Sequence, residues 1–337
     1  MTVFIQNPED ELKDEVYIRI VSSADEVVEL PNDLDVARQL IMARELDLLV
    51  YGDVGMDSMG YFLPFSRLAK RTALFWGHAL SSGIANYDGV DSTGLNPELV
   101  GGVDYFVTSK MFEGDLPHSF RTPQARYSET LYMMDGLTTY FMPPLPPREG
   151  ADLTYFGLPL DKNIYLCPQT LYKLHPDFDK LIVEILRRDT DAVIVFPVAI
   201  KVEWTEALMD RMLKGVGEFR KRVLFVRRMD FDEFVALAKL ANVVLDPFPV
   251  GGGRSSLEIF STGTPIVMPY HRTNILQLTY GMYKTMGIED LVCYTDSEYI
   301  DKAVAVATDR GKSMQVEKRQ SMKAGTFLDF CRLRPCI

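Results

Sequence analysis

Short apolar runs alternate along this chain with longer stretches in which apolar residues recur every three or four positions. The second half shows this most clearly, where the apolar run Ala192–Phe196 follows the amphipathic stretch Asp177–Arg187. Continuous apolar strands separated by helices are typical of a parallel sheet that is covered on both faces. The pattern therefore predicts an α/β protein of the doubly wound type.

The same pattern predicts the individual elements. Strands are expected at Val16–Val21, Leu48–Tyr51, Thr72–Trp76, Tyr105–Val107, Leu131–Met134, Ile164–Leu166, Ala192–Phe196, Val223–Val226, Val243–Leu245, Pro265–Met268 and Leu291–Tyr294. Helices are expected after Asp33, over Asp177–Arg187, Trp204–Val216, Asp230–Leu240, Ser255–Ser261 and Asn274–Met286, and from about Ser297 and Lys312.

A proline-rich segment separates the two halves of the pattern. Four of the five residues from Pro143 to Pro147 are proline, which removes backbone donors and stiffens the chain. We therefore predict an N-terminal lobe over residues 1–142, a hinge over 143–150 and a C-terminal lobe over 151–337. A proline-rich surface loop within a single domain is the alternative.

Composition narrows the class of protein. The chain is 47% hydrophobic and 25% charged, as globular proteins are, and its net charge of −11 disfavours nucleic acid as a partner. No apolar run reaches the roughly 18 residues that a membrane span needs. The sequence does not begin with the basic segment and following apolar segment of a secretory signal peptide. Four scattered cysteines fit a reducing compartment. These features predict a cytoplasmic or nuclear protein with no membrane partner.

The most informative chemistry follows the predicted strand that ends at Leu245. Gly251, Gly252 and Gly253 come next, and Ser255 and Ser256 open a helix that carries Glu258 one turn later. Glycines let a ligand approach the backbone, and a helix N-terminus attracts anions. Glu258 is placed to accept hydrogen bonds from a ribose diol. A plain turn with a serine cap and an early-helix glutamate is the alternative.

Three further strand ends carry candidate residues. Lys173 follows the strand at Ile164–Leu166 and is able to neutralise a phosphate; His78 follows Thr72–Trp76; Asp53 follows Leu48–Tyr51. A solvated lysine, a structural histidine and a capping aspartate are the corresponding alternatives.

Pairs of aspartates spaced as in metal-dependent sugar transferases also occur. Each of them precedes a predicted helix, where capping explains it: Asp33 with Asp35, Asp177 with Asp179, and Asp230 with Asp232. We therefore predict no catalytic metal.

Three stretches of the sequence resemble one enzyme family. They are "GMDSMGYFLPFSRLAKRTALFWGHALSSGIANYD", "CPQTLYKLHPDFD" and "VLFVRRMDFDEFVALAKLANVVLDPFPVGGGRSSLEIFSTGTPIV", and they resemble the catalytic region of protein O-GlcNAc transferase-like glycosyltransferases, family 41. The resemblance runs from about Leu46 to about Ala307. It implies the GT-B architecture, in which two Rossmann-like lobes bind the sugar nucleotide mainly through the C-terminal lobe. It also implies an incomplete N-terminal lobe, since the family begins with a further βαβ portion, and the absence of a tetratricopeptide array.

The resemblance assigns roles to the matching positions. Lys173 would contact the UDP pyrophosphate, Tyr172 would line the active site, and Thr170 stands where the animal enzymes carry glutamine. Ser255 matches a phosphate-contacting residue and Glu258 the ribose-binding acid.

The uracil side is assigned in the same way. The main chain near Met229 and the ring of Phe234 fall where the family holds the base, and His78 lies in a loop near the donor sugar. Gly253 and Arg254 depart from the animal enzymes. The triplet Gly251, Gly252 and Gly253 resembles the sequence at this position in bacterial and algal relatives more than that in the animal enzymes.

The resemblance implies metal-independent, inverting transfer of GlcNAc from UDP-GlcNAc to serine or threonine of a protein, with no cofactor besides the UDP-sugar substrate. Asp53, His78 and Tyr172 remain candidates for the base that takes the acceptor proton. Two alternatives stay open. One is a GT-B enzyme with another sugar or with a small-molecule or glycan acceptor. The other is an inactive module that binds UDP or a partner.

Overall fold

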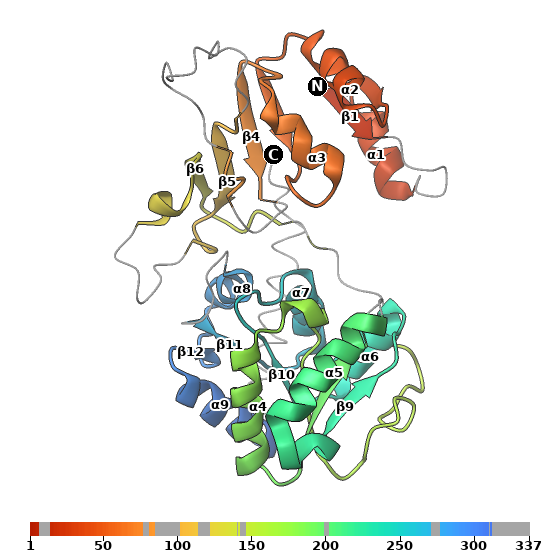
Figure 1. Ribbon diagram of the computed structural model, residues 1–337, viewed down its shortest axis with the longest axis vertical. Helices are drawn as coiled ribbons and strands as arrows, with labels where there is room; N and C mark the ends of the chain where they lie inside the picture. Colours follow the sequence, from red (N-terminus) through yellow and green to blue (C-terminus); the bar gives the residue numbers. More distant parts are fainter. Residues whose placement is uncertain are drawn as a thin grey trace. The chain divides into compact units, whose positions relative to one another are not determined.

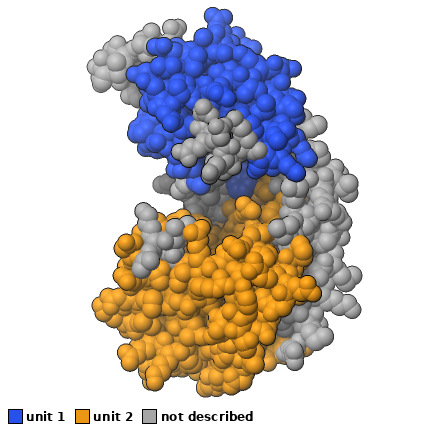
Figure 2. All heavy atoms as spheres, turned by 90° about the vertical axis from the view of Figure 1, so that its right-hand side faces the viewer, with its two compact units in different colours: residues 1–108, 121–134 blue, residues 109–120, 135–337 orange. Residues whose placement is uncertain are grey.

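The computed structural model describes residues 1–6, 14–76, 81–84, 102–113, 122–139, 141, 146–198, 202–270, 277–309 and 311. The chain divides into two compact units (Figure 2), one of residues 1–108 and 121–134 and the other of residues 109–120 and 135–337. We call them unit 1 and unit 2. The expected hinge at 143–150 falls inside unit 2, just beyond this division.

Unit 2 contains a six-stranded parallel sheet. Its strands are β7 (Asn163–Leu166), β8 (Ala192–Pro197), β9 (Val223–Val226), β10 (Val243–Leu245), β11 (Ile266–Pro269) and β12 (Val292–Cys293). They lie in the order β12-β11-β10-β7-β8-β9, and every pair is parallel. Counted from β7 this is the 3-2-1-4-5-6 order of doubly wound folds, so the prediction of a doubly wound sheet is confirmed for unit 2.

Two groups of helices pack on this sheet (Figure 1). The first is α4 (Pro176–Arg188), α5 (Val202–Val216) and α9 (Asp296–Thr308), in which α4 packs against both others and α9 against β7, β10 and β11. The second includes α6 (Phe231–Leu240) and α7 (Arg254–Thr262), which pack together, and α8 (Leu278–Met286). Side chains such as Ile164, Ile182 and Ile194 are fully buried in the resulting core.

Unit 1 holds two smaller sheets. In the first, β1 (Thr2–Gln6) pairs in parallel with β2 (Glu26–Leu30), and α1 (Glu15–Ser23) connects them. After α2 (Leu34–Met42) comes a sheet in the order β3-β4-β5-β6, made of β3 (Leu48–Tyr51), β4 (Arg71–Phe75), β5 (Tyr105–Ser109) and β6 (Thr130–Met134). The pairs β3–β4 and β4–β5 are parallel, and the short helix α3 (Ser58–Phe62) follows β3.

The structure corrects one predicted element. Residues 16–21 are not a strand but part of α1, which begins where the Asp14 carboxylate accepts a hydrogen bond from the Tyr17 N–H at 2.8 Å. The alternating Val16, Ile18 and Ile20 imitate a strand pattern, yet all three are exposed on the helix. The strands β1 and β2 were not predicted at all. The predicted helix from Lys312 and the start of the predicted helix at Asn274 lie outside the described residues.

Within the described ranges, no helix is long and apolar enough to span a bilayer.

Candidate functional site

The loops after β7 and β10 leave the unit 2 sheet next to each other, because these two strands are parallel neighbours. They flank the position where the strand order reverses, which is where doubly wound sheets bind their ligands. A β-bridge between Leu174 and Pro249 joins the two loops directly. The fold therefore brings the Lys173 loop and the glycine-rich loop, which are far apart in the sequence, into one place.

Gln169 links the two loops through its side chain. Its Nε2 donates to Ser255 Oγ at 2.9 Å, and its Oε1 accepts from Lys173 Nζ at 3.4 Å. Gln169 is buried, whereas the neighbouring Thr170 is exposed. Sequence reasoning named Thr170 through the family resemblance and missed Gln169, although a polar residue so close to a strand end was a signal.

Lys173 is half-buried in a 3₁₀ turn at Leu171–Lys173. Burial lowers the pKa of its ammonium, and the negative charge of Asp246 acts in the opposite direction. A partly desolvated ammonium attracts an anion more strongly than one in water, because the local dielectric constant is lower.

The side chain of Asp246 holds the glycine-rich loop in place. This carboxyl is buried and accepts from the Gly252 N–H at 2.7 Å, while Thr279 Oγ1 donates to the Gly252 carbonyl at 3.2 Å. A Cβ at Gly252 would overlap Ser256 Oγ and lie 3.0 Å from Gln169 Nε2. Only glycine fits at this position without displacing those groups. Sequence reasoning also missed Asp246, which burial alone reveals.

Helix α7 begins directly after this loop. Its N-cap is Gly253, which has no side chain to cap the first-turn N–H groups. The Ser256 N–H donates to the Gly253 carbonyl at 3.1 Å, which leaves the N–H groups of Arg254 and Ser255 to face an anion. Ser255 is half-buried at this end. Ser256 is buried and shares a 2.8 Å hydrogen bond with Thr279, so its hydroxyl supports the loop.

Glu258 lies one turn further along α7 and is buried, which raises its pKa. It accepts from Arg254 Nε at 2.8 Å, and the Arg254 guanidinium lies 5.6 Å from the centre of the Phe231 ring. This stacking joins α7 to the start of α6. Met229 and Phe234 flank the same end of α6 and are both half-buried.

Tyr172 points outward from the Lys173 turn. It is 65% exposed, and its ring meets Trp204 edge-on at 5.2 Å. An exposed aromatic beside a ligand site is available to contact a substrate.

Two predicted site residues belong to unit 1. Asp53 is half-buried after β3, and its carboxylate accepts from the Met56 N–H at 3.3 Å, which is a turn contact. His78 lies outside the described residues. The segment at Ser81–Ser82 that follows it is held by buried Glu129, which accepts from Ser81 Oγ at 2.7 Å and from the Ser82 N–H at 2.7 Å.

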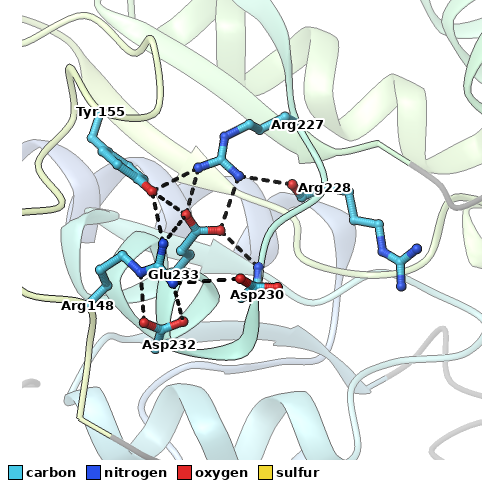
Figure 3. A network of polar contacts seen from close by, with 7 residues as sticks. All are labelled: Arg148, Tyr155, Arg227, Arg228, Asp230, Asp232 and Glu233. Atoms are coloured by element: carbon cyan, nitrogen blue, oxygen red, sulfur yellow. Dashed lines mark hydrogen bonds and ion pairs between the residues drawn. The ribbon is translucent and has the colours of Figure 1, made fainter.

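A network of charged side chains supports the start of α6 (Figure 3). Glu233 accepts from Arg227 at 2.7 Å, from Arg148 at 2.9 Å, and from the Tyr155 hydroxyl. Arg148 also pairs with Asp232 at 2.8 Å. These contacts fasten residues 148–155 to the helix end beside Met229. They keep the pKa of Glu233 at about 2, chiefly through the hydrogen bond from Arg227.

This network predicts a measurable acid sensitivity. Because the folded-state pKa of Glu233 is depressed from 4.5 to about 2, its ionised form stabilises the fold above pH 4.5. That contribution is lost as the pH falls from 4.5 towards 2. We expect the melting temperature to fall more steeply over this window in the wild type than in Glu233→Gln. Thermal unfolding followed by circular dichroism measures the melting temperature at each pH, and Glu206→Gln, at an exposed position, is the control. Equal dependence of the melting temperature on pH in all three proteins would refute this role of Glu233.

No three His, Cys, Asp or Glu side chains gather as metal ligands would in the part of the chain that the structure describes.

Comparison with known proteins places this site in a family. The family model of glycosyl transferase family 41 matches residues 151–328, which is more than half of the chain and includes the Lys173 loop, the glycine-rich loop and helices α6 and α7. The chain belongs to glycosyl transferase family 41. The resemblance stated from the sequence is confirmed.

Curated relatives in this family are much longer than the chain. It is 27% identical over 158 residues to the UDP-N-acetylglucosamine–peptide N-acetylglucosaminyltransferase of Caenorhabditis elegans, covering 46% of this chain and 13% of that one. It is 24% identical over 231 residues to SEC of Arabidopsis thaliana, which is named as a probable enzyme of the same activity. This match covers 64% of this chain and 22% of that one. The chain thus spans less than a quarter of either relative.

Two solved structures share the fold of this chain. An O-GlcNAc transferase of Thermobaculum terrenum matches with a TM-score of 0.73 at 18% identity, covering 98% of this chain and 61% of that one. The sucrose-phosphate synthase of Thermosynechococcus elongatus matches with a TM-score of 0.55 at 14% identity, covering 91% of this chain and 78% of that one. These similarities confirm the predicted GT-B class of α/β fold.

Proposed function

We propose that this family 41 chain binds UDP-GlcNAc at the strand-order reversal of unit 2 and transfers GlcNAc to serine or threonine hydroxyls of proteins. The observation that carries the donor site is the joining of the Lys173 loop to the first turn of α7 by Gln169 and Ser255. One curated relative is named as a peptide N-acetylglucosaminyltransferase and the other as a probable one, which supports the choice of sugar and acceptor.

The arrangement suits a reaction in which UDP leaves with growing negative charge. Lys173, the Ser255 hydroxyl and the N–H groups that open α7 would stabilise the pyrophosphate without reorganising. Glu258 would accept hydrogen bonds from the ribose once Arg254 shares or releases it. The main chain at Met229, the Phe234 ring and residue Thr170 would line the nucleotide.

The second half of the proposed reaction is the attack of the acceptor hydroxyl on the sugar. The hydroxyl attacks the sugar carbon from the face opposite UDP and gives up its proton, and Asp53, His78 and Tyr172 are the candidate bases. We propose that the protein works in the cytoplasm or nucleus, with which the buried free thiols of Cys167 and Cys293 are compatible.

Removal of metal ions tests the proposed chemistry. If positive charge at the pyrophosphate comes from Lys173 and the helix end, transfer of labelled GlcNAc to protein should be unchanged after dialysis against EDTA. The measurement follows the transfer of label from UDP-[14C]GlcNAc to a mixture of candidate protein acceptors. Hydrolysis of the donor is measured as well, because it needs no acceptor. Activity that disappears with EDTA and returns with a divalent ion would contradict metal independence.

Gly252→Ala tests the geometry of the loop. Because the added methyl group overlaps Ser256 Oγ and crowds Gln169, we expect the loop to shift at a cost of about 1–3 kcal/mol, weakening UDP about tenfold to a hundredfold. In Gly253→Ala the methyl group meets only the end of the Leu278 side chain at 2.9 Å, so binding should change little. Calorimetric titration with UDP compares them, and equal affinities would contradict this account of the loop.

A further inference from the structure

The side-chain amide of Gln277 is buried without a partner close to the proposed donor site. Gln277 is 1% exposed, and neither its Nε2 nor its Oε1 has a hydrogen bond within the described part of the chain. A buried amide without hydrogen bonds destabilises a fold, so each such group in a native protein calls for an explanation, such as a ligand or a bound water.

The backbone that carries this side chain is firmly held. Gln277 is the N-cap of α8, its N–H donates to the Phe112 carbonyl at 3.1 Å, and its carbonyl accepts from the Gly281 N–H at 2.8 Å. Phe112 packs so closely on α8 that a Cβ at Gly281 would lie 2.6 Å from its ring. The Gln277 side chain nevertheless caps none of the first-turn N–H groups of the helix. Its free amide is therefore not the product of a loose turn.

The start of α8 contacts the glycine-rich loop. Thr279 Oγ1 donates to the Gly252 carbonyl at 3.2 Å, and a Cβ at Gly253 would lie 2.9 Å from the Leu278 side chain. Helices α7 and α8 therefore begin beside each other at one end of unit 2 (Figure 1). Gln277, which comes directly before this first turn, lies next to the loop at which we propose that the diphosphate binds.

The strand order indicates which part of the donor would reach α8. Along the sheet, β9 is followed by β8, β7, β10 and β11. In the proposed donor site the base lies at the start of α6, which follows β9, and the diphosphate lies at the loops after β7 and β10. The sugar is attached to the far end of the diphosphate. It would therefore continue towards β11, and the helix that follows β11 is α8.

The carboxamide indicates the chemistry of the group that it would bind. Its Nε2 donates and its Oε1 accepts, so together they suit two neighbouring hydroxyls, one of which accepts while the other donates. GlcNAc carries such a pair on adjacent ring carbons. The ribose carries one as well, but it is expected at Glu258, which leaves the transferred sugar as the ligand of Gln277.

We propose that Gln277 binds two neighbouring hydroxyls of the transferred sugar and thereby selects which sugar the donor carries. This proposal rests on the donor site proposed above. Because the side chain is shielded from solvent, the sugar has to open the surrounding chain to reach it, and the amide then binds the sugar away from water. A buried polar site of this kind discriminates strongly against a sugar whose hydroxyls do not match.

Gln277→Met tests the contact, because methionine is similar in size and shape but has no amide. We expect the variant to bind UDP as the wild type does, and UDP-GlcNAc at least tenfold more weakly than the wild type does. The wild type should also prefer UDP-GlcNAc to UDP-GalNAc, in which one hydroxyl of the pair is inverted, and the variant should lose that preference. Titration calorimetry with each of the three ligands gives the affinities.

Two controls separate this contact from effects on the fold. Gln39→Met makes the same change at an exposed position of α2 in unit 1 and should leave all three affinities unchanged. The second control is thermal unfolding of the protein without ligand. Replacing an unpaired buried amide with an apolar group should keep the melting temperature of Gln277→Met at or above that of the wild type.

Three results would overturn the proposal. The first is an equal loss of affinity for UDP and UDP-GlcNAc, which would show that the amide supports the loop and not the sugar. The second is an unchanged affinity of Gln277→Met for UDP-GlcNAc. The third is a lower melting temperature of the variant, which would show that water or protein already pairs with the amide. Failure of the wild type to bind UDP would contradict the donor site itself and, with it, this proposal.

Discussion

Lys173→Ala is expected to reduce the rate of GlcNAc transfer by about 100- to 1,000-fold, the loss seen when one preorganised stabiliser of transition-state charge is removed. The expectation follows from the position of Lys173, half-buried beside the opening of α7 and hydrogen-bonded to Gln169 at 3.4 Å. Through Gln169 its ammonium is linked to Ser255 at the start of α7, where we propose that the pyrophosphate binds. Initial rates with labelled UDP-GlcNAc, at saturating donor, measure the effect.

Two comparisons make this result specific. Lys180→Ala removes an exposed lysine of α4 that pairs with Asp177 at 2.6 Å, and should keep wild-type rates. Lys173→Arg keeps the charge but changes its shape, so partial activity is expected. A folded Lys173→Ala protein with wild-type turnover would reject the proposed donor site.

Asp246→Asn is expected to remove a pH dependence from donor binding. Burial raises the pKa of Asp246 to about 6, and the groups that face it are Lys173, the Cys167 thiol and the Tyr299 hydroxyl. Above pH 6 the carboxylate is ionised beneath the loop that would hold a dianionic diphosphate. The repulsion favours protonation of Asp246 when the donor binds, so affinity for UDP-GlcNAc should fall as the pH rises above 6.

The asparagine variant keeps an oxygen to accept from the Gly252 N–H but carries no charge. We expect it to bind UDP-GlcNAc about tenfold more tightly than the wild type at pH 8, which corresponds to one pKa unit. At pH 6.5, midway between the two pKa values, calorimetry in two buffers of different ionisation enthalpy should show uptake of about half a proton in the wild type and none in the variant. UDP-GlcNAc is the suitable ligand, because its diphosphate is esterified at both ends. Proton uptake that persists in Asp246→Asn would contradict the role, whereas failure of the wild type to bind would contradict the donor site itself.

The sequence predicted unit 2 well, for identifiable reasons. Its strands are buried on both faces and therefore read as apolar runs such as Val243–Leu245, which the structure shows as β10 with no exposed residue. Helix starts also carried local signals, as at α6, where Asp230 and Glu233 form a capping box.

Unit 1 was predicted less well, because its elements are more exposed. Helix α1 buries none of its residues, so its β-branched residues were not constrained to a helical spacing and looked like a strand. The pairing of β1 with β2 depends on contacts between distant segments, which periodicity does not encode.

The candidate site shows the same division. Lys173, the glycine triplet and Glu258 follow strand ends, which made them candidates, and the family resemblance gave them their expected roles. Gln169 acts through a hydrogen bond to Ser255 that crosses 86 positions of the chain, and this contact forms only because β7 and β10 are neighbours. Asp246 acts within the loop after β10, through its burial and its bond to the Gly252 N–H.

The central claim is that unit 2 holds a nucleoside diphosphate between the Lys173 turn and the start of α7. Its most direct test is calorimetric titration of the purified chain with UDP in the presence of EDTA, for the wild type and for Lys173→Ala. The account predicts micromolar binding by the wild type and loss of that binding in the variant, with both proteins folded. No binding by a folded wild type, or equal binding by both, would contradict it.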